Sequence, residues 1–464
     1  MPPTMTKTTT TSVRPAPSLR EAELKAVHAE LRRGNADFLK AHPGDSGERQ
    51  PVHVLYGGAH LFKRDSAAKI GGLALKSLEE YAPTPESLAQ ALGLPGGAFA
   101  QKLHARVVEK LKREAVEDFR IDFEDGYGNR PDAEEDGHAA SAAAEAAEGL
   151  AAKTLPPFLG IRIKPLSEPC RRRSLRTLDI FLTTLVSTAS RRLPPHFVIT
   201  LPKITSARQP SALAKALGML EKKLRLPQGT LKIEFMVETP QSIFADDGRA
   251  ALPELLKAAQ GRCVSAHLGT YDYTALCGII AAHQSMAHPC CDFAKHVMQV
   301  ALAQRGIQLS DGATNVMPVP VHRPSPGTTL SEAQKRENAQ AVHRAWKLAY
   351  DHTRHSLVTG FYEGWDLHPA QIPIRYAAVY AFFLESLESS ASRLKNFVEK
   401  AAQATLLGDV FDDAATGQGL LNFFLRGLNC GAITLEEALA TGLSQEEFES
   451  RSFLKILENR RKLG

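Results

Sequence analysis

Two short apolar runs decide the fold of this chain: Ile-Glu-Phe-Met-Val-Glu-Thr-Pro at 233–240 and Val-Ser-Ala-His-Leu-Gly-Thr-Tyr-Asp at 264–272. Both have the composition of buried strands, and a helix-length segment at 251–261 with leucines at helical spacing separates them. The pattern predicts a strand–helix–strand unit of a parallel sheet. Each run ends in a carboxylate, Glu238 or Asp272, and such strand ends lie side by side in neighbouring parallel strands.

Two adjacent carboxylates suit a divalent cation, because Mg²⁺ prefers oxygen ligands and keeps positions open for water and substrate. We therefore predict that Glu238 and Asp272 bind Mg²⁺ or Mn²⁺. The alternative is structural, since a lone acid at a strand end is more often a cap or a solvated residue. The segment 269–278 turns into a helix, and free N–H groups at its start, at Gly269 and Thr270, suit a substrate carboxylate.

The same alternation of strands and helices runs through most of the chain. A β-rich run at 52–56, stopped by two glycines, begins the series, and a long helical segment at 59–118 follows. Further strands are predicted at 119–126, 158–165, 196–203, 314–321 and 362–369, and helices at 132–150, 174–187, 211–224, 294–305 and 329–358. Eight strands with intervening helices predict an α/β protein with a (β/α)₈ TIM barrel.

The segments outside the barrel have different compositions. Residues 1–18 are rich in Thr and Pro and lack acids, which is typical of a disordered tail, with an organelle-targeting peptide as the alternative. The barrel is expected at 19–371 and begins with an amphipathic helix at 19–42. Residues 372–464 are helical, and acids and glycines interrupt them at 406–420, as in a loop that covers a site. This predicts a C-terminal helical lid domain.

Composition argues against several classes of partner. The chain has 464 residues and a mild net charge of +5, and its basic clusters are not interleaved with aromatic residues, so nucleic acid is not an expected partner. No apolar run approaches membrane-spanning length, so no membrane partner is expected. The six cysteines form no CxxC pair and no zinc spacing, which indicates reduced thiols and a cytoplasmic protein.

Two other predicted strands carry charges that need partners. Glu124 and Asp125 belong to a strand end with three acids in four positions, which is costly unless a cation or hydrogen-bond donors lie nearby. Arg162 alternates with isoleucines along the next strand, and a buried cation needs an anionic partner. A solvated strand end and a structural salt bridge are the alternatives to a functional site.

Taken in order from about 52 to 371, these strand ends resemble the superfamily of citrate lyase β-subunits, malyl-CoA lyases and HpcH/HpaI aldolases, which are TIM barrels of the phosphoenolpyruvate/pyruvate type. The matching pieces are Asp-Phe-Glu-Asp-Gly at 122–126, Ile-Arg-Ile at 161–163, Leu-Pro-Lys-Ile at 201–204, Val-Glu-Thr-Pro at 237–240, Leu-Gly-Thr-Tyr-Asp at 268–272, Leu-Ser-Asp-Gly at 309–312 and Gly-Trp-Asp-Leu-His-Pro-Ala-Gln at 364–371. A further piece, Gly-Asp-Val-Phe-Asp-Asp-Ala-Ala-Thr at 408–416, resembles the C-terminal motif of malyl-CoA lyases and malate synthases.

The resemblance implies a role for each matched position. Glu238 and Asp272 would ligate Mg²⁺, and Arg162 would hold the oxygen of an enolate and steady its charge. Glu124 and Asp125 would orient metal-bound waters without binding the metal themselves.

Three further positions receive implied roles. Gly269 and Thr270 would offer backbone donors to a substrate carboxylate, and Asp413 would move a proton as acid or base. The chain departs from CoA-using relatives at its first strand, where their Arg-Ser…Pro-Gly pattern is absent. This departure counts against a CoA thioester substrate, although Lys63 and Arg64 could compensate.

The implied chemistry agrees with the residues. Breaking a C–C bond beside a carbonyl leaves an enolate, which needs a metal and a cation to accept its charge. We expect a Mg²⁺-dependent carbon–carbon lyase or aldolase, a homo-oligomer, that acts on a small 2-oxo acid-derived or 3-hydroxyacyl substrate. The open alternatives are a malate synthase-like condensation of acetyl-CoA with glyoxylate, a non-catalytic oxo-acid-binding or scaffold protein and, more remotely, a phosphoenolpyruvate-using phosphotransferase.

Overall fold

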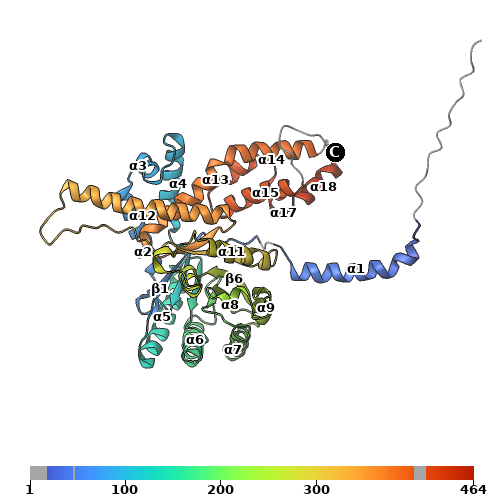
Figure 1. The fold of residues 1–464 in the computed structure, drawn as a ribbon, viewed down its shortest axis with the longest axis horizontal. Helices are drawn as coiled ribbons and strands as arrows, with labels where there is room; N and C mark the ends of the chain where they lie inside the picture. Colours follow the sequence, from blue (N-terminus) through green and yellow to red (C-terminus); the bar gives the residue numbers. More distant parts are fainter. Residues whose placement is uncertain (1–17, 45–46, 402–413, 464) are drawn as a thin grey trace, which may run out of the picture. The chain divides into compact units, whose positions relative to one another are not determined.

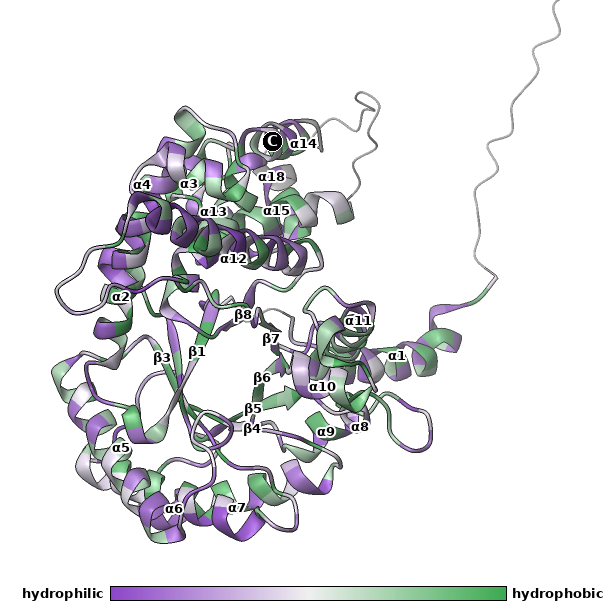
Figure 2. Ribbon diagram, turned by 60° about the vertical axis from the view of Figure 1, so that its left-hand side comes forward, coloured by the Kyte–Doolittle hydropathy of each residue, from purple (hydrophilic) through white to green (hydrophobic). Residues whose placement is uncertain are grey.

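Eight parallel strands form a closed barrel in the computed structural model, which describes residues 18–44, 47–401 and 414–463. The strands pair in sequence order, and β8 pairs with β1 to close the barrel (Figure 2). They are β1 His53–Gly58, β2 Asp118–Asp122, β3 Phe158–Arg162, β4 Val198–Leu201, β5 Lys232–Val237, β6 Cys263–Leu268, β7 Gln308–Ala313 and β8 Glu363–Asp366. The predicted (β/α)₈ barrel is confirmed.

Helices surround the barrel and cover the apolar outer face of its strands (Figure 2). Those between successive strands from β2 onward are α5 Asp132–Ala152, α6 Arg171–Thr188, α7 Arg208–Leu224, α8 Pro240–Ile243, α9 Leu252–Ala258, α10 Thr270–Leu276, α11 Pro289–Leu302 and α12 Glu332–Val358. The helix pairs α5–α6 and α6–α7 pack against each other, as expected of neighbours around a barrel.

A second group of helices packs together beside the barrel. Helix α12 contacts α13 and α3, α13 contacts α4, and α14 contacts α15 (Figure 1). This group contains α2 Ser66–Tyr81, α3 Pro85–Leu92, α4 Ala98–Glu114, α13 Ile372–Glu385, α14 Leu387–Ala401, α15 Ala414–Asn429, α16 Leu435–Leu439, α17 Gln445–Ser450 and α18 Phe453–Leu463. Single 3₁₀ turns lie at Ala59–Leu61, Ala281–His283 and Pro369–Gln371.

Two of the predicted element positions are wrong. The seventh strand is Gln308–Ala313 rather than 314–321, because Pro318 and Pro320 lack the N–H that a ladder needs. Its Ser-Asp-Gly run is polar and gave no apolar signal. The sixth strand ends at Leu268, so Asp272 lies on the short helix α10 rather than at a strand end.

A polar layer lies inside the barrel below its carboxyl end. The Arg120 guanidinium donates from Nε to Glu234 Oε1 (3.1 Å) and from Nη2 to Oε2 (2.8 Å), and it also pairs with Asp118. The hydroxyls of Thr200 and Ser265 donate to the same carboxylate at 2.7 and 2.9 Å. Burial acts to raise the pKa of Glu234, but Arg120 lowers it to about 2. This network joins strands β2, β4, β5 and β6.

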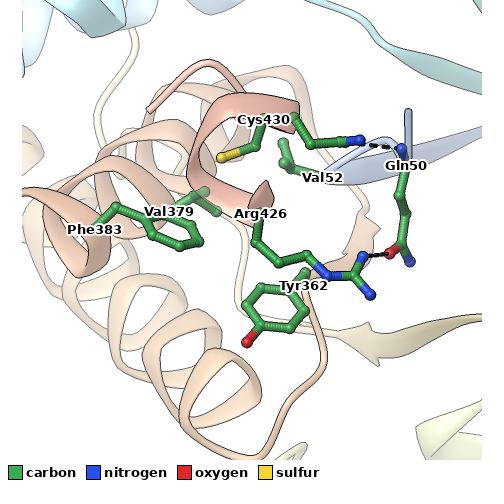
Figure 3. A pocket seen from close by; sticks show the side chains of 8 residues that line it. Gln50, Val52, Tyr362, Val379, Phe383, Arg426 and Cys430 are labelled. Carbon is green, nitrogen blue, oxygen red and sulfur yellow. Dashed lines mark hydrogen bonds between the residues drawn. The ribbon is translucent and has the colours of Figure 1, made fainter. Parts of the chain in front are cut away.

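Helix α15 contacts Gln50, just before β1, and Tyr362, just before β8, at the end of the barrel where the strands begin. Figure 3 shows these side chains. Arg426 Nη1 donates to Gln50 Oε1 (2.9 Å), and the Gln50 N–H donates to Asn429 Oδ1 (3.0 Å). The Arg426 guanidinium lies 5.0 Å from the centre of the Tyr362 ring. Together these residues line a cavity of about 10 Å³, which has room for about one water molecule.

These contacts place the described part of α15 away from the carboxyl ends of the strands, where the predicted site lies. The central segment of the predicted lid, 402–413, lies outside the described residues. The lid and the predicted domain boundaries therefore stay predictions.

The N-terminal helix forms part of a separate compact unit. Helix α1 Glu21–Ala41 belongs with residues 303–306 to this unit, and the described residues from 47 onward otherwise belong to the barrel unit. The amphipathic helix predicted at 19–42 is confirmed.

All six cysteines are free, as their spacing predicted. Within residues 18–44, 47–401 and 414–463, no helix combines the length and apolar character needed to cross a bilayer.

Arg120→Met tests the polar layer, because it leaves the buried carboxylates of Asp118 and Glu234 without their cation. Breaking a buried ion pair costs about 3–5 kcal/mol, and we expect the free energy of urea unfolding to fall by about that much. The control is Arg113→Met on α4, whose side chain is 63% exposed in a surface ion pair. Such pairs contribute about 0–1 kcal/mol. Equal losses in the two variants would contradict the structural role of the layer.

Candidate active site

Charged side chains from five consecutive strand ends meet at the carboxyl end of the barrel. They come from the end of β2 and the loop after it, the end of β3, the loops after β4 and β5, and helix α10 after β6. The residues are Asp122, Glu124, Asp125, Arg162, Lys203, Glu238 and Asp272. The structure therefore brings together five predicted site residues, Glu124, Asp125, Arg162, Glu238 and Asp272.

Arg162 is buried, with 1% of its side chain exposed, and is held from two sides. Its Nε and Nη2 donate to the two oxygens of Asp122 at 2.7 and 2.5 Å. This bidentate pair supplies the anionic partner that the sequence required. The guanidinium lies 4.8 Å from the Tyr56 ring centre and 5.5 Å from that of Trp365. Its remaining nitrogen, Nη1, lies 3.1 Å from Glu124 Oε2 and faces the other carboxylates.

Lys203 lies at the centre of the carboxylates and was not assigned a role from the sequence. Its Nζ lies 2.7 Å from Glu124 Oε1 and 3.3 Å from both Asp125 and Asp272. Burial acts to lower the pKa of Lys203, but the charges of Glu124 and Glu238 raise it, so the side chain is an ammonium. Two signals in the sequence pointed to it: its position two residues after the apolar run of β4, and its place in the matching piece Leu-Pro-Lys-Ile at 201–204.

Glu238 is the most deeply buried acid of the proposed metal pair, with 1% exposed. Burial raises the pKa of its carboxyl to about 8, and the charges of Glu124 and Asp272 act in the same direction. A Cβ at Gly269 would lie 2.4 Å from Glu238 Oε2, so the close approach of this carboxylate to β6 requires glycine.

The charges of the site do not balance, and the imbalance fits a divalent cation. The carboxylates are those of Asp122, Glu124, Asp125, Glu238 and Asp272, and the cations are Arg162 and Lys203. Carboxylate oxygens are the donors that Mg²⁺ and Mn²⁺ prefer. Within the described residues no three His, Cys, Asp or Glu side chains are arranged to hold a metal. Two protein ligands, Glu238 and Asp272, would leave the remaining positions to water and substrate.

The start of α10 differs in part from the prediction. The Gly269 N–H donates to the Val237 carbonyl at 3.0 Å, so this amide is engaged in the barrel and does not point to a substrate. Thr270 is buried, and its Oγ1 has no hydrogen-bond partner. A Cβ at Gly312 would lie 1.9 Å from Thr270 Oγ1, so this hydroxyl packs against β7, and a contact of Thr270 with a ligand stays a prediction.

The floor of the site is aromatic and contains an unpredicted histidine. His267, on β6, is fully buried, and its ring lies 6.2 Å from Tyr56 and 5.8 Å from Trp365. Burial lowers the pKa of His267 to about 4, so the imidazole is neutral at physiological pH. Neither of its ring nitrogens, nor Nε1 of Trp365, has a protein hydrogen-bond partner. The sequence did not single out His267 or Trp365. In a strand buried on both faces, the sequence does not distinguish side chains that point into the barrel from those that point outward.

Two further predictions concern Asp413 and the basic pair Lys63 and Arg64. Asp413 lies outside the described residues. Lys63 Nζ pairs with Glu145 at 3.1 Å, and Arg64 pairs with Glu148, so both basic side chains are engaged with helix α5.

The fold and the site define a (β/α)₈-barrel protein with an acidic site at the carboxyl end of its strands. The family model described as Domain of unknown function (DUF6986) matches residues 31–456, and the chain belongs to this family. A comparison with the curated proteins gave no match.

Solved structures with a related fold carry other names. A citrate lyase from Burkholderia xenovorans LB400 is 18% identical with a TM-score of 0.54, over 85% of this chain and 97% of that one. A Haloferax volcanii malate synthase in its lead(II) complex is 13% identical with a TM-score of 0.44, over 90% and 99%. The protein CitE of Mycobacterium tuberculosis, in complex with magnesium and acetoacetate, is 15% identical with a TM-score of 0.39, over 72% and 91%. At this identity the first likeness supports the fold alone.

Glu238→Gln should remove a pH dependence of stability from the metal-free protein. The pKa of Glu238 is about 8 in the folded protein and near 4.5 in the unfolded chain, so the folded protein binds an extra proton between these values. The stability due to this group is present below about pH 4.5 and is lost as the pH rises toward 8. The Tm of the wild type should therefore fall more steeply over this range than that of the variant. Parallel curves would contradict the raised pKa, and Glu254→Gln, an exposed acid on α9, should follow the wild type.

Proposed function

We propose that this protein is a Mg²⁺-dependent carbon–carbon lyase or aldolase that acts through an enolate on a 2-oxo acid-derived or 3-hydroxyacyl substrate. The observation that supports it most is the meeting of Glu238, Asp272 and Arg162 at one end of the barrel. Enolate chemistry needs a divalent cation and a fixed positive charge beside the reacting oxygen. An acidic pair next to a rigid guanidinium provides places for both.

The chain's own residues would divide the work. Glu238 and Asp272 would hold the ion, which when bound supplies positive charge to a keto and a carboxylate oxygen. Arg162, fixed in plane by Asp122, would face negative charge that develops on the substrate oxygen. Glu124 lies within reach of both Arg162 and Lys203 and would orient metal-bound water.

Other roles in the proposal come from the sequence. Asp413 would transfer the proton, and Asp125 would assist Glu124 in orienting water. Residues 372–464 would supply the lid. The protein would be a cytoplasmic homo-oligomer of the citrate lyase β-subunit, malyl-CoA lyase and HpcH/HpaI aldolase superfamily, and the fold likeness to a citrate lyase is consistent with this.

We further propose a free acid rather than a CoA thioester as the substrate, because the first strand lacks the pattern of CoA-using relatives. Lys63 and Arg64, the residues that could replace the missing CoA contacts, form ion pairs with Glu145 and Glu148. Reactions that require tight binding of acetyl-CoA, such as a malate synthase-like condensation, are correspondingly less favoured.

The direct test is the exchange of pyruvate methyl protons with D₂O, followed by NMR. The wild type should catalyse exchange with Mg²⁺ and lose it with EDTA. In Glu238→Gln and Asp272→Asn the exchange rate should fall at least about 100-fold. This is the upper end of the loss caused by removing a residue that only supports a metal ligand. Glu254→Gln is the matched control and should keep the wild-type rate. If both site variants exchange protons as fast as the wild type, the metal assignment is wrong.

A further inference from the structure

Lys203 contacts both proposed metal ligands. Its backbone N–H donates to Glu238 Oε1 at 2.7 Å, and its Nζ lies 3.3 Å from Asp272 Oδ2. Glu238 follows β5, whereas Asp272 lies on α10 after β6. The lysine therefore connects the two segments that carry the proposed metal ligands.

The backbone at Lys203 is held in an unusual conformation that makes this double contact possible. Its φ is +50°, in the left-handed region that a residue with a Cβ seldom adopts. The turn directs the N–H toward Glu238 while the side chain reaches the carboxylates on the other side. Strained backbone of this kind persists where the surrounding structure requires it, and it is often found at functional sites.

We propose that Lys203 is a positioning residue that serves as a built-in counter-cation. Its ammonium holds Asp272 beside Glu238 while no metal is bound, and a divalent cation displaces it from Asp272. This inference rests on the proposed metal site, and it adds that the Lys203 ammonium competes with the metal for Asp272. It concerns this residue alone and does not require a particular substrate.

The contacts make such a displacement a short movement. The side chain of Asp272 is 41% exposed, so a cation from solution can reach it. The contact of Lys203 Nζ with Asp272 is also longer than its contact with Glu124. An ammonium that leaves Asp272 stays paired with Glu124 at 2.7 Å. Two cations cannot share one carboxylate closely without repulsion. The metal and Lys203 therefore compete for Asp272, while Glu124 retains the displaced charge.

The test measures Mn²⁺ binding to the full-length protein by the EPR signal of free Mn²⁺. Lys203→Met removes the competing charge and keeps the backbone N–H that holds Glu238. A charge within about 4–6 Å alters a neighbouring ionic equilibrium by about one to three powers of ten, so Mn²⁺ should bind at least about tenfold more tightly. Without metal the Tm of Lys203→Met should be lower than that of the wild type, and saturating Mn²⁺ should remove most of this difference.

Three further variants make the result specific. Lys203→Gln keeps a donor for Glu124 without the charge and should also bind Mn²⁺ more tightly, which gives the measurement a second route if Lys203→Met does not fold. Lys203→Arg keeps the charge and should bind Mn²⁺ like the wild type. Lys215→Met, an exposed lysine on α7, should change neither affinity nor Tm.

The outcomes separate this inference from the proposed function. Unchanged or weaker Mn²⁺ binding in both neutral variants would overturn the counter-cation role while leaving the metal site intact. If the wild type binds Mn²⁺ and Glu238→Gln binds it equally well, the ligand assignment fails instead. If neither the wild type nor the neutral variants bind Mn²⁺, both the metal site and the role of Lys203 are wrong.

Discussion

Unbalanced negative charge at the carboxyl end of the barrel is the constraint on which the rest of the site depends. Five carboxylates gather there around two cations, and three of the acids, Asp122, Glu124 and Glu238, are buried. Without compensation such a cluster would repel itself or take up protons, as the raised pKa of Glu238 shows. The bidentate pair of Arg162 with Asp122 and the central position of Lys203 are the two compensations that the chain itself provides.

Two acids, one on β5 and one directly after it, have opposite environments and different roles. Glu234 and Glu238 are four residues apart along β5 and its loop, and both are buried. Arg120 and two hydroxyls satisfy Glu234 and lower its pKa to about 2, whereas Glu238 has no guanidinium of its own and has a pKa of about 8. Environments that separate the pKa values of similar groups are typical of working sites. The ion-paired layer around Glu234 stabilises the barrel, and the acidic cluster around Glu238 is suited to bind a cation.

The fold was largely predictable because buried parallel strands are continuous apolar runs and the helices between them have clear periodicity. Strand β7 was the exception. Its Ser310, Asp311 and Gly312 are polar or small, and Asp311 is tolerated because Lys295 and Ser356 contact it from α11 and α12. The partners are distant in sequence, so apolar patterning could not show that this run is a buried strand, although 309–312 was among the pieces that matched the family.

The sequence by itself determined the barrel, the acidic strand ends and the need for an anionic partner at Arg162, because alternation and the cost of burying charge are local properties. Only the tertiary structure decided that the partner is Asp122, that Lys203 lies among the carboxylates, and that the Gly269 amide is already used by Val237. It also decided that His267 faces the interior of the barrel. Each of these depends on which residues of neighbouring strands meet in space, and register between strands is set by the packing of the whole barrel rather than by any one segment.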